Sequence, residues 1–130
     1  MLTFNVESSR GFRPAFSPDS RFLATGERGT IDLWDISSGK RQERIAYLSL
    51  SYHNNSAFDI AFGPDGRTLI SNERDYSTGK YKMKFWDIFS KSERQTLNDL
   101  DISCIALSPD GYTLASGSGD GTTIKLWRLL

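Results

Sequence analysis

One sequence unit is repeated three times along this chain of 130 residues. The copies contain the stretches "SPDSRFLATGERGTIDLW", "GPDGRTLISNERDYSTGKYKMKFW" and "SPDGYTLASGSGDGTTIKLW", which begin at Ser17, Gly63 and Ser108. Consecutive copies start 46 and 45 residues apart. A fixed step of this size is typical of repeat architectures, in which each repeat is one supersecondary unit. The repeat therefore constrains the fold more than any single motif does.

Each copy has the same succession of short strands and tight turns. An apolar strand leads into a Pro-Asp turn, and a second strand follows as "RFLAT", "RTLIS" or "YTLAS". After a turn rich in polar residues and Gly, a third strand ends at a tryptophan. Proline presets φ in such turns, and two-residue alternation of β-branched and aromatic residues favours strands. The first two copies continue into a fourth strand, "RQERIAY" and "RQTLND", so the pattern predicts an all-β meander.

The motif that ends each third strand resembles the signature of WD-repeat β-propellers. Copies one and two carry "LWDI" and "FWDI", whereas copy three reads "LWRL", with Arg128 in place of the aspartate. The resemblance implies three four-stranded antiparallel blades that form an open arc or half-propeller. It places blade one at about 11–47, blade two at about 57–98 and blade three at about 102–130. The outer strand of blade three would come from an N-terminal segment at about 2–6.

The resemblance also implies a set of structural residues. In the family, a buried network joins a histidine, a Ser or Thr on the second strand, an aspartate and the tryptophan indole, and such networks stabilise when fully satisfied. Blade two matches this set most completely, with His53 preceded by Tyr52 where the family has glycine. We therefore expect the tryptophans to be core residues. The residues assigned a structural role are Trp34, Trp86, Trp127, Ser71, Asp75, Ser116 and Asp120.

Composition and charge narrow the class of protein. Sixteen basic and sixteen acidic residues cancel, so nothing draws the whole chain to nucleic acid. No apolar run approaches the ~20 residues of a membrane span, and the start "MLTFNVESSR" lacks the features of a signal peptide. A single cysteine, Cys104, excludes an internal disulfide framework. We therefore expect a cytoplasmic protein that binds neither nucleic acid nor membrane.

Candidate catalytic and metal-binding residues are few. His53 and Cys104 are the only residues of their types, and a catalytic dyad would need them side by side. Cys104 lies in the apolar strand "ISCIAL", which predicts a buried, inert thiol. No zinc-ligand cluster is present, and "GSGDG" lies between two strands, where a turn is favoured over a phosphate loop. The sequence thus predicts no enzyme activity, no metal and no cofactor.

A partner-binding surface is expected on the loops that, in WD-repeat propellers, emerge on one face. The second copy has the longest such loops, and tyrosine and arginine are enriched in binding hot spots. These features favour a non-catalytic scaffold for protein–protein interaction. Two alternatives stay open: a truncated C-terminal remnant of a longer WD-repeat protein, and a small-ligand or enzyme site at the channel mouth. The candidate binding residues are Tyr52, His53, Arg74, Tyr76, Lys80 and Tyr81.

Three blades fall short of the four to eight with which propellers close. An open arc would expose an apolar blade face at each end, which is an aggregation liability. A homodimer in which each Leu2–Val6 completes the last blade of its partner chain would give six blades. The alternative is a companion propeller fragment of four blades.

Overall fold

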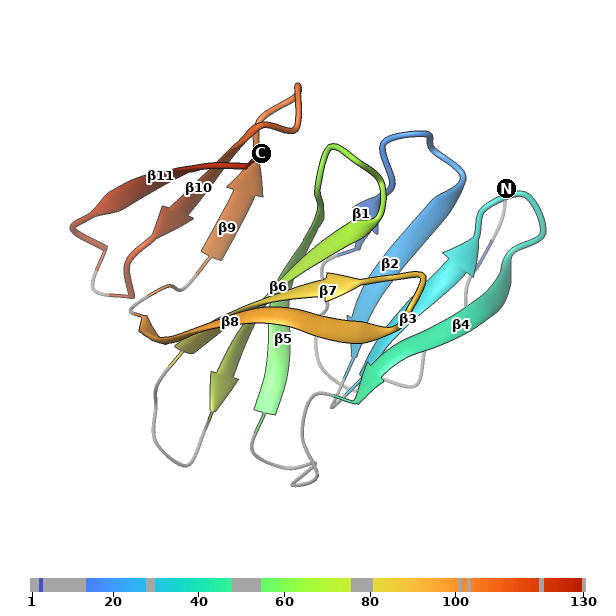
Figure 1. The fold of residues 1–130 in the computed structure, drawn as a ribbon, viewed down its shortest axis with the longest axis horizontal. Coiled ribbons are helices and arrows are strands. Elements are labelled where there is room, and N and C mark those ends of the chain that lie inside the picture. Colours follow the sequence, from blue (N-terminus) through green and yellow to red (C-terminus); the bar gives the residue numbers. More distant parts are fainter. Residues whose placement is uncertain are drawn as a thin grey trace.

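All regular structure in the described part of the chain is β-strand. The computed structural model describes residues 3, 14–27, 30–47, 55–75, 81–100, 102, 104–119 and 121–129. These form three antiparallel sheets that fan out side by side (Figure 1). In these ranges no helix is long and apolar enough to cross a membrane. The predicted all-β blade architecture is confirmed.

Each sheet is one copy of the repeat, and its strands lie in sequence order. Blade one contains β1 (Ala15–Phe16), β2 (Phe22–Glu27), β3 (Thr30–Asp35) and β4 (Lys40–Tyr47). Blade two contains β5 (Asn55–Phe62), β6 (Thr68–Asp75), β7 (Tyr81–Asp87) and β8 (Ser92–Leu100). Blade three has three strands in the described residues, β9 (Cys104–Leu107), β10 (Thr113–Gly117) and β11 (Ile124–Arg128).

The Pro-Asp turns join the first two strands of every blade in one way. The fourth turn residue has a positive φ: 62° at Ser20, 67° at Gly66 and 81° at Gly111. Its amide donates to the carbonyl of the first turn residue at 2.9 to 3.1 Å. The turn aspartate accepts a hydrogen bond from a nearby backbone N–H, as Asp19 does from Arg21 at 3.0 Å. Glycine reaches this left-handed region without a steric cost, which explains the PDG form of two copies.

The core lies between neighbouring blades. We call the face of a blade that points toward the next blade its leading face, and the opposite one its trailing face. Ile31 and Leu33 on the leading face of blade one pack with Phe62, Leu69 and Trp86 of blade two. Blades two and three repeat the arrangement, in a cluster formed by Ala61, Ile70, Met83, Ile102, Ile105 and Leu114.

Two polar side chains of blade two also reach the backbone of blade three. The Asp59 carboxylate accepts a hydrogen bond from the Ile105 N–H at 2.8 Å. The Asn72 amide nitrogen donates to the Ile102 carbonyl at 3.0 Å. The repeat places Gly26 and Gly117 where blade two has Asn72, so this contact is specific to one joint. It fixes the inner strand of blade three against blade two.

The predicted outer strand at Leu2–Val6 lies outside the described residues, apart from Thr3. Its pairing with blade three therefore stays a prediction. Pro14 is exposed and directly precedes β1, so its missing N–H removes no ladder bond from that strand.

Candidate functional site

The predicted binding patch falls mostly outside the described residues. This is true of Tyr52, His53, Tyr76 and Lys80, and for Arg74 the structure describes the backbone alone. Tyr81 begins β7, lies opposite Arg74 in the ladder and is half-buried. The patch therefore stays a prediction. The surfaces that the structure does describe are the faces of the blades, the edge of β11 and a groove between blades two and three.

The three tryptophans make one common contact. The indole N–H donates to a hydroxyl on the second strand of the same blade: Trp34 to Thr25 at 2.9 Å, Trp86 to Ser71 at 3.0 Å and Trp127 to Ser116 at 2.9 Å. Trp34 and Trp86 are buried, whereas Trp127 is half-buried and lines a groove. His53, Asp120 and the side chain of Asp75 lie outside what the structure describes.

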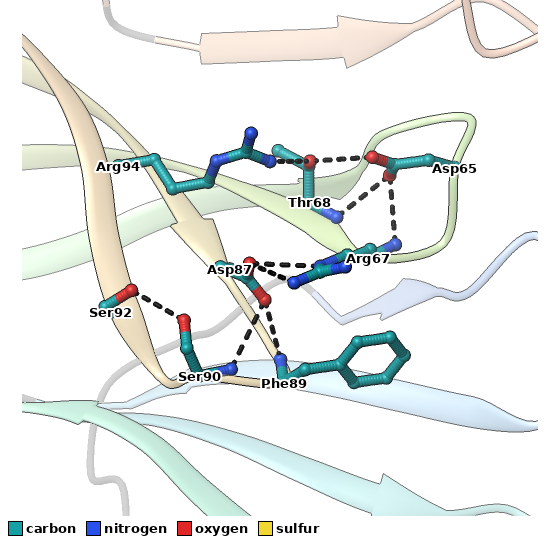
Figure 2. A network of polar contacts seen from close by, with 8 residues as sticks. All are labelled: Asp65, Arg67, Thr68, Asp87, Phe89, Ser90, Ser92 and Arg94. Carbon is teal, nitrogen blue, oxygen red and sulfur yellow. Dashed lines mark hydrogen bonds and ion pairs between the residues drawn. The ribbon is translucent and has the colours of Figure 1, made fainter.

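The aspartate after Trp86 organises a second network, which Figure 2 shows. Both the Nε and a terminal nitrogen of Arg67 meet the Asp87 Oδ2, at 3.0 and 2.9 Å. The other carboxylate oxygen accepts hydrogen bonds from the N–H groups of Phe89 and Ser90. The Arg67 contact, followed by these amides, holds the pKa of Asp87 below its usual value. The guanidinium also lies 5.1 Å from the centroid of the Phe89 ring.

Blade three lacks this pair. The repeat places Tyr112 where blade two has Arg67, and Arg128 where it has Asp87. Blade one keeps the two residue types as Arg21 and Asp35. The two substitutions in blade three therefore remove both charges of the pair together, and Arg128 becomes an exposed cation on the last described strand.

The leading face of blade three is apolar and uncovered. Ile124 and Leu126 are 76% and 72% exposed. The repeat aligns Ile124 with Ile31 and Met83, and it aligns Leu126 with Leu33 and with Phe85, which is half-buried. Ile31 and Met83 are both 0% exposed, and Leu33 is 5% exposed. The difference follows from position: blades one and two each have a described neighbour on this side, and blade three has none.

The exposure of Cys104 differs from what the sequence predicts. The pattern "ISCIAL" predicted a buried thiol, but Cys104 is exposed. It lies at the start of β9 opposite Gly117, where a Cβ on the glycine would come within 3.0 Å of the thiol sulfur. Strand periodicity shows which residues share a face but not whether another blade covers that face. The thiol is thus a natural reporter of the uncovered surface.

A groove of about 800 Å³ separates the outer part of blade two from β11. Its apolar lining comes from Ile70, Phe85 and Leu97 of blade two and from Trp127 and Leu129 of blade three. Arg94 and Arg128 stand at its walls. β11 pairs with β10 alone among the described residues, so its other edge opens beside this groove.

Blade two also contains a buried charge pair that the sequence pattern does not reveal. Glu73 is 1% exposed, and the Lys84 ammonium lies 3.3 Å from its Oε2. Neither carboxylate oxygen accepts a well-aligned hydrogen bond from the described residues. Burial raises the pKa of Glu73 to about 7, against the opposing pull of Lys84. The aligned residues are Glu27 and Asp32 in blade one and Ser118 and Lys125 in blade three, so neither copy repeats this pair of opposite charges.

Within the described residues, no three His, Cys, Asp or Glu side chains come close enough to hold a metal ion. The described geometry consists of blade faces, a strand edge and a groove. Such surfaces bind other polypeptides through apolar burial and backbone pairing.

Comparison with protein families matches the repeat directly. The WD40 model, described as a WD domain or G-beta repeat, matches residues 12–35 and 92–128. The human apoptotic protease-activating factor 1 is 36% identical over 105 residues, which are 76% of this chain and 8% of that protein. The guanine nucleotide-binding protein subunit beta of Nicotiana plumbaginifolia is 33% identical, over 86% of this chain and 30% of that protein. The chain thus spans less than a third of these two relatives.

Solved structures show the same fold at low sequence identity. The WD40 repeats of RRP9 superpose with a TM-score of 0.63 at 19% identity, over 98% of this chain and 41% of that chain. A structure described as a putative 6-phosphogluconolactonase from Bacteroides uniformis gives a TM-score of 0.67 at 18% identity, over 97% of this chain and 38% of that chain. At such identities the likeness concerns the arrangement of blades.

Proposed function

Because the chain belongs to the WD-repeat family, we propose that it is a non-catalytic scaffold for protein–protein interaction that docks a further blade on the leading face of blade three. The observation that carries the proposal is the exposure of Ile124 and Leu126, at 76% and 72%, on the face where blades one and two bury Ile31, Leu33 and Met83. Apolar surface of this kind is stabilised by removal from water.

A second copy of the chain fits this face, because its first blade offers the matching surface. Phe16 on blade one is 68% exposed, whereas the aligned Phe62 of blade two is 2% exposed and packs against blade one. The inter-blade contact inside the chain is thus a template for the contact between chains. In such a dimer the leading face of blade three of each copy contacts the trailing face of blade one of the other copy. The two equivalent contacts give six blades with two-fold symmetry.

The test is the solution mass of the purified 130-residue chain together with the reactivity of Cys104. Light scattering at micromolar concentration should give about twice the chain mass of 14.6 kDa. A thiol reagent should react more slowly with Cys104 as the protein concentration rises, because the docked blade covers that face. The variant Leu126→Asp should be monomeric with a fast-reacting thiol.

The matched control is Phe89→Asp, which changes a side chain that is 71% exposed on blade two and away from the proposed contact. It should remain dimeric. A wild-type chain that is monomeric, melts cooperatively and reacts at Cys104 at one rate at all concentrations contradicts the second-copy proposal. The companion propeller fragment would then be the remaining candidate for this face.

A further inference from the structure

The joint between blades one and two, which lie side by side in Figure 1, contains a buried carboxylate. Glu73 on β6 is 1% exposed and shares a strand face with Leu69 and Ser71, because side chains alternate along a strand. Leu69 belongs to the core cluster that blade two forms with blade one, so this face is the trailing face of blade two. A charge at such a place is costly unless hydrogen bonds and a counter-charge replace the water that it has lost.

The surroundings of Glu73 replace that water only in part. Neither carboxylate oxygen accepts a well-aligned hydrogen bond from the described residues. The Lys84 ammonium lies 3.3 Å from its Oε2 but also 3.9 Å from the Glu93 carboxylate, so one cation is shared between two anions. Lys82 on β7 is the remaining charged group that acts on Glu73. The described residues that blade one adds to the cluster at this joint are apolar: Ala24, Ile31 and Leu33, with Ala15 and Phe22 packed against them.

The buried carboxylate at the joint between blades two and three is held differently. Asp59 is 4% exposed, and its Oδ2 accepts a hydrogen bond from the Ile105 N–H of blade three at 2.8 Å. The Asn72 amide adds a second hydrogen bond across this joint, to the Ile102 carbonyl. The Asp59 carboxylate thus joins two blades directly, whereas the ionisation of Glu73 gains no such bond from a described residue.

We propose that the joint between blades one and two is a proton-controlled hinge, which is closed while Glu73 is protonated and opens to water as Glu73 ionises. The joint between blades two and three stays closed, so these two blades move as one body relative to blade one. Proteins open locally at their least stable contacts before they unfold as a whole. This inference concerns a joint inside the chain, so it can fail while the proposed contact between chains stands, and the reverse.

The direction of the effect follows from proton linkage. In the open state the Glu73 carboxyl is solvated and has its ordinary pKa of 4.5, whereas burial in the closed state raises its pKa to about 7. Between these two values the closed state binds more protons than the open state, so the equilibrium constant for opening rises with pH. Above the higher value both states are ionised, and the constant levels off. From pH 5 to pH 8 the constant should increase on the order of 10- to 100-fold.

Two buried alanines provide matched probes of the two joints. Ala24 is 0% exposed at the joint between blades one and two, and Ala61 is 6% exposed at the joint between blades two and three. The variants Ala24→Cys and Ala61→Cys, each made in the full chain with Cys104→Ser, are treated with a thiol reagent from pH 5 to pH 8. The ratio of the two labelling rates cancels the pH dependence of the thiol chemistry. This ratio should rise by the same factor as the opening constant, in favour of Ala24→Cys.

The substitution Glu73→Gln should remove the pH dependence of the ratio, because an amide does not titrate in this range. Asp59→Asn, the corresponding change at the other joint, should preserve the rise. A ratio that stays constant from pH 5 to pH 8 in the chain with Glu73 overturns the inference, since a parallel rise at both probes means that Glu73 acts only on global unfolding. That measurement decides even if Glu73→Gln does not fold. A rise that persists in Glu73→Gln also overturns it, because another group would then control the joint.

Discussion

Two nitrogens of the Arg67 guanidinium converge on a single oxygen of Asp87, at 3.0 and 2.9 Å, and so tie the start of β6 to the end of β7. The second carboxylate oxygen caps the turn into β8 through the Phe89 and Ser90 amides. Asp87, the aspartate of the FWDI motif, thus links the end of β7 to the residue before β6 and to the turn before β8, as Figure 2 shows.

Asp87→Asn should lower the urea midpoint of unfolding, and Arg67→Gln should do so by a smaller amount. The double variant should be less affected than the sum of the two, because both changes remove the same contact. Asp87 has a lowered pKa in the folded state, so its stabilising effect is present above the ordinary value of 3.8 and is lost as the pH falls through the folded value. Lys40→Gln, which removes an exposed charge from blade one, is the control.

The pair can be rebuilt in blade three. The double variant Tyr112→Arg with Arg128→Asp should melt at a higher temperature than either single variant. Its unfolding free energy should exceed that of the single variants by up to about 1 kcal/mol. The reason is that the repeat aligns these positions with Arg67 and Asp87. Calorimetry of the four proteins measures the coupling. Strictly additive effects would show that blade three holds these two positions farther apart than blade two does.

Each tryptophan should be important for stability, and in a definite order. Replacement by Ala should cost on the order of 3–5 kcal/mol for buried Trp86, which lies in the central blade, and less for Trp127, which is half-buried. Urea melts of the three Ala variants provide the ranking. Trp86→Phe should still cost about 1–3 kcal/mol, because the buried Ser71 hydroxyl loses its partner. Three midpoints close to wild type would contradict this role.

Stability should fall as the pH rises from about 4.5 through about 7, owing to Glu73. Its pKa is raised to about 7 in the folded state, so the folded chain binds more protons than the unfolded chain in this window. Glu73→Gln should remove the slope and stabilise the protein at pH 8 by roughly 1–3 kcal/mol. Lys84, Lys82 and Glu93 are the charged groups that act on this carboxyl. Chemical melts across this range test the effect, with Glu43→Gln on blade one as the control.

The loop patch on blade two stays a prediction of the sequence. Replacing Tyr52, Arg74 and Tyr76 together with Ser should leave the melting temperature within a few degrees, because surface substitutions cost less than ~0.5 kcal/mol each. Binding of a partner purified from the native source should be lost. Unfolding of the triple variant would instead place these side chains in the core.

The fold of this chain follows from local rules, whereas its exposed surfaces do not. Pro-Asp turns and strand alternation depend on residues that are close together in the sequence, and the strands lie where those patterns predict. The environment of Cys104 depends on whether another blade covers β9, which no window of sequence reports. The groove beside Trp127 likewise lies next to an edge of β11 that no described strand pairs with. Glu73 could have been noticed as a charged residue in a strand interior, but its burial depends on packing between blades.

In blade one the third strand carries the acidic residue of an ion pair and the outer strand the basic one, Asp32 and Arg41, whereas in blade two the order is reversed, with Lys84 and Glu93. This reversal bears on how a chain of similar units avoids misfolding. Repeats with nearly the same strands can pair with the wrong neighbour while they fold. If β8 were exchanged for β4 at the edge of β7, Arg41 would face Lys84, and the converse exchange would set Glu93 against Asp32. Like charges at such positions are destabilising. Each pair therefore disfavours the exchange of outer strands between the two blades, by up to about 1 kcal/mol for contacts that are partly exposed.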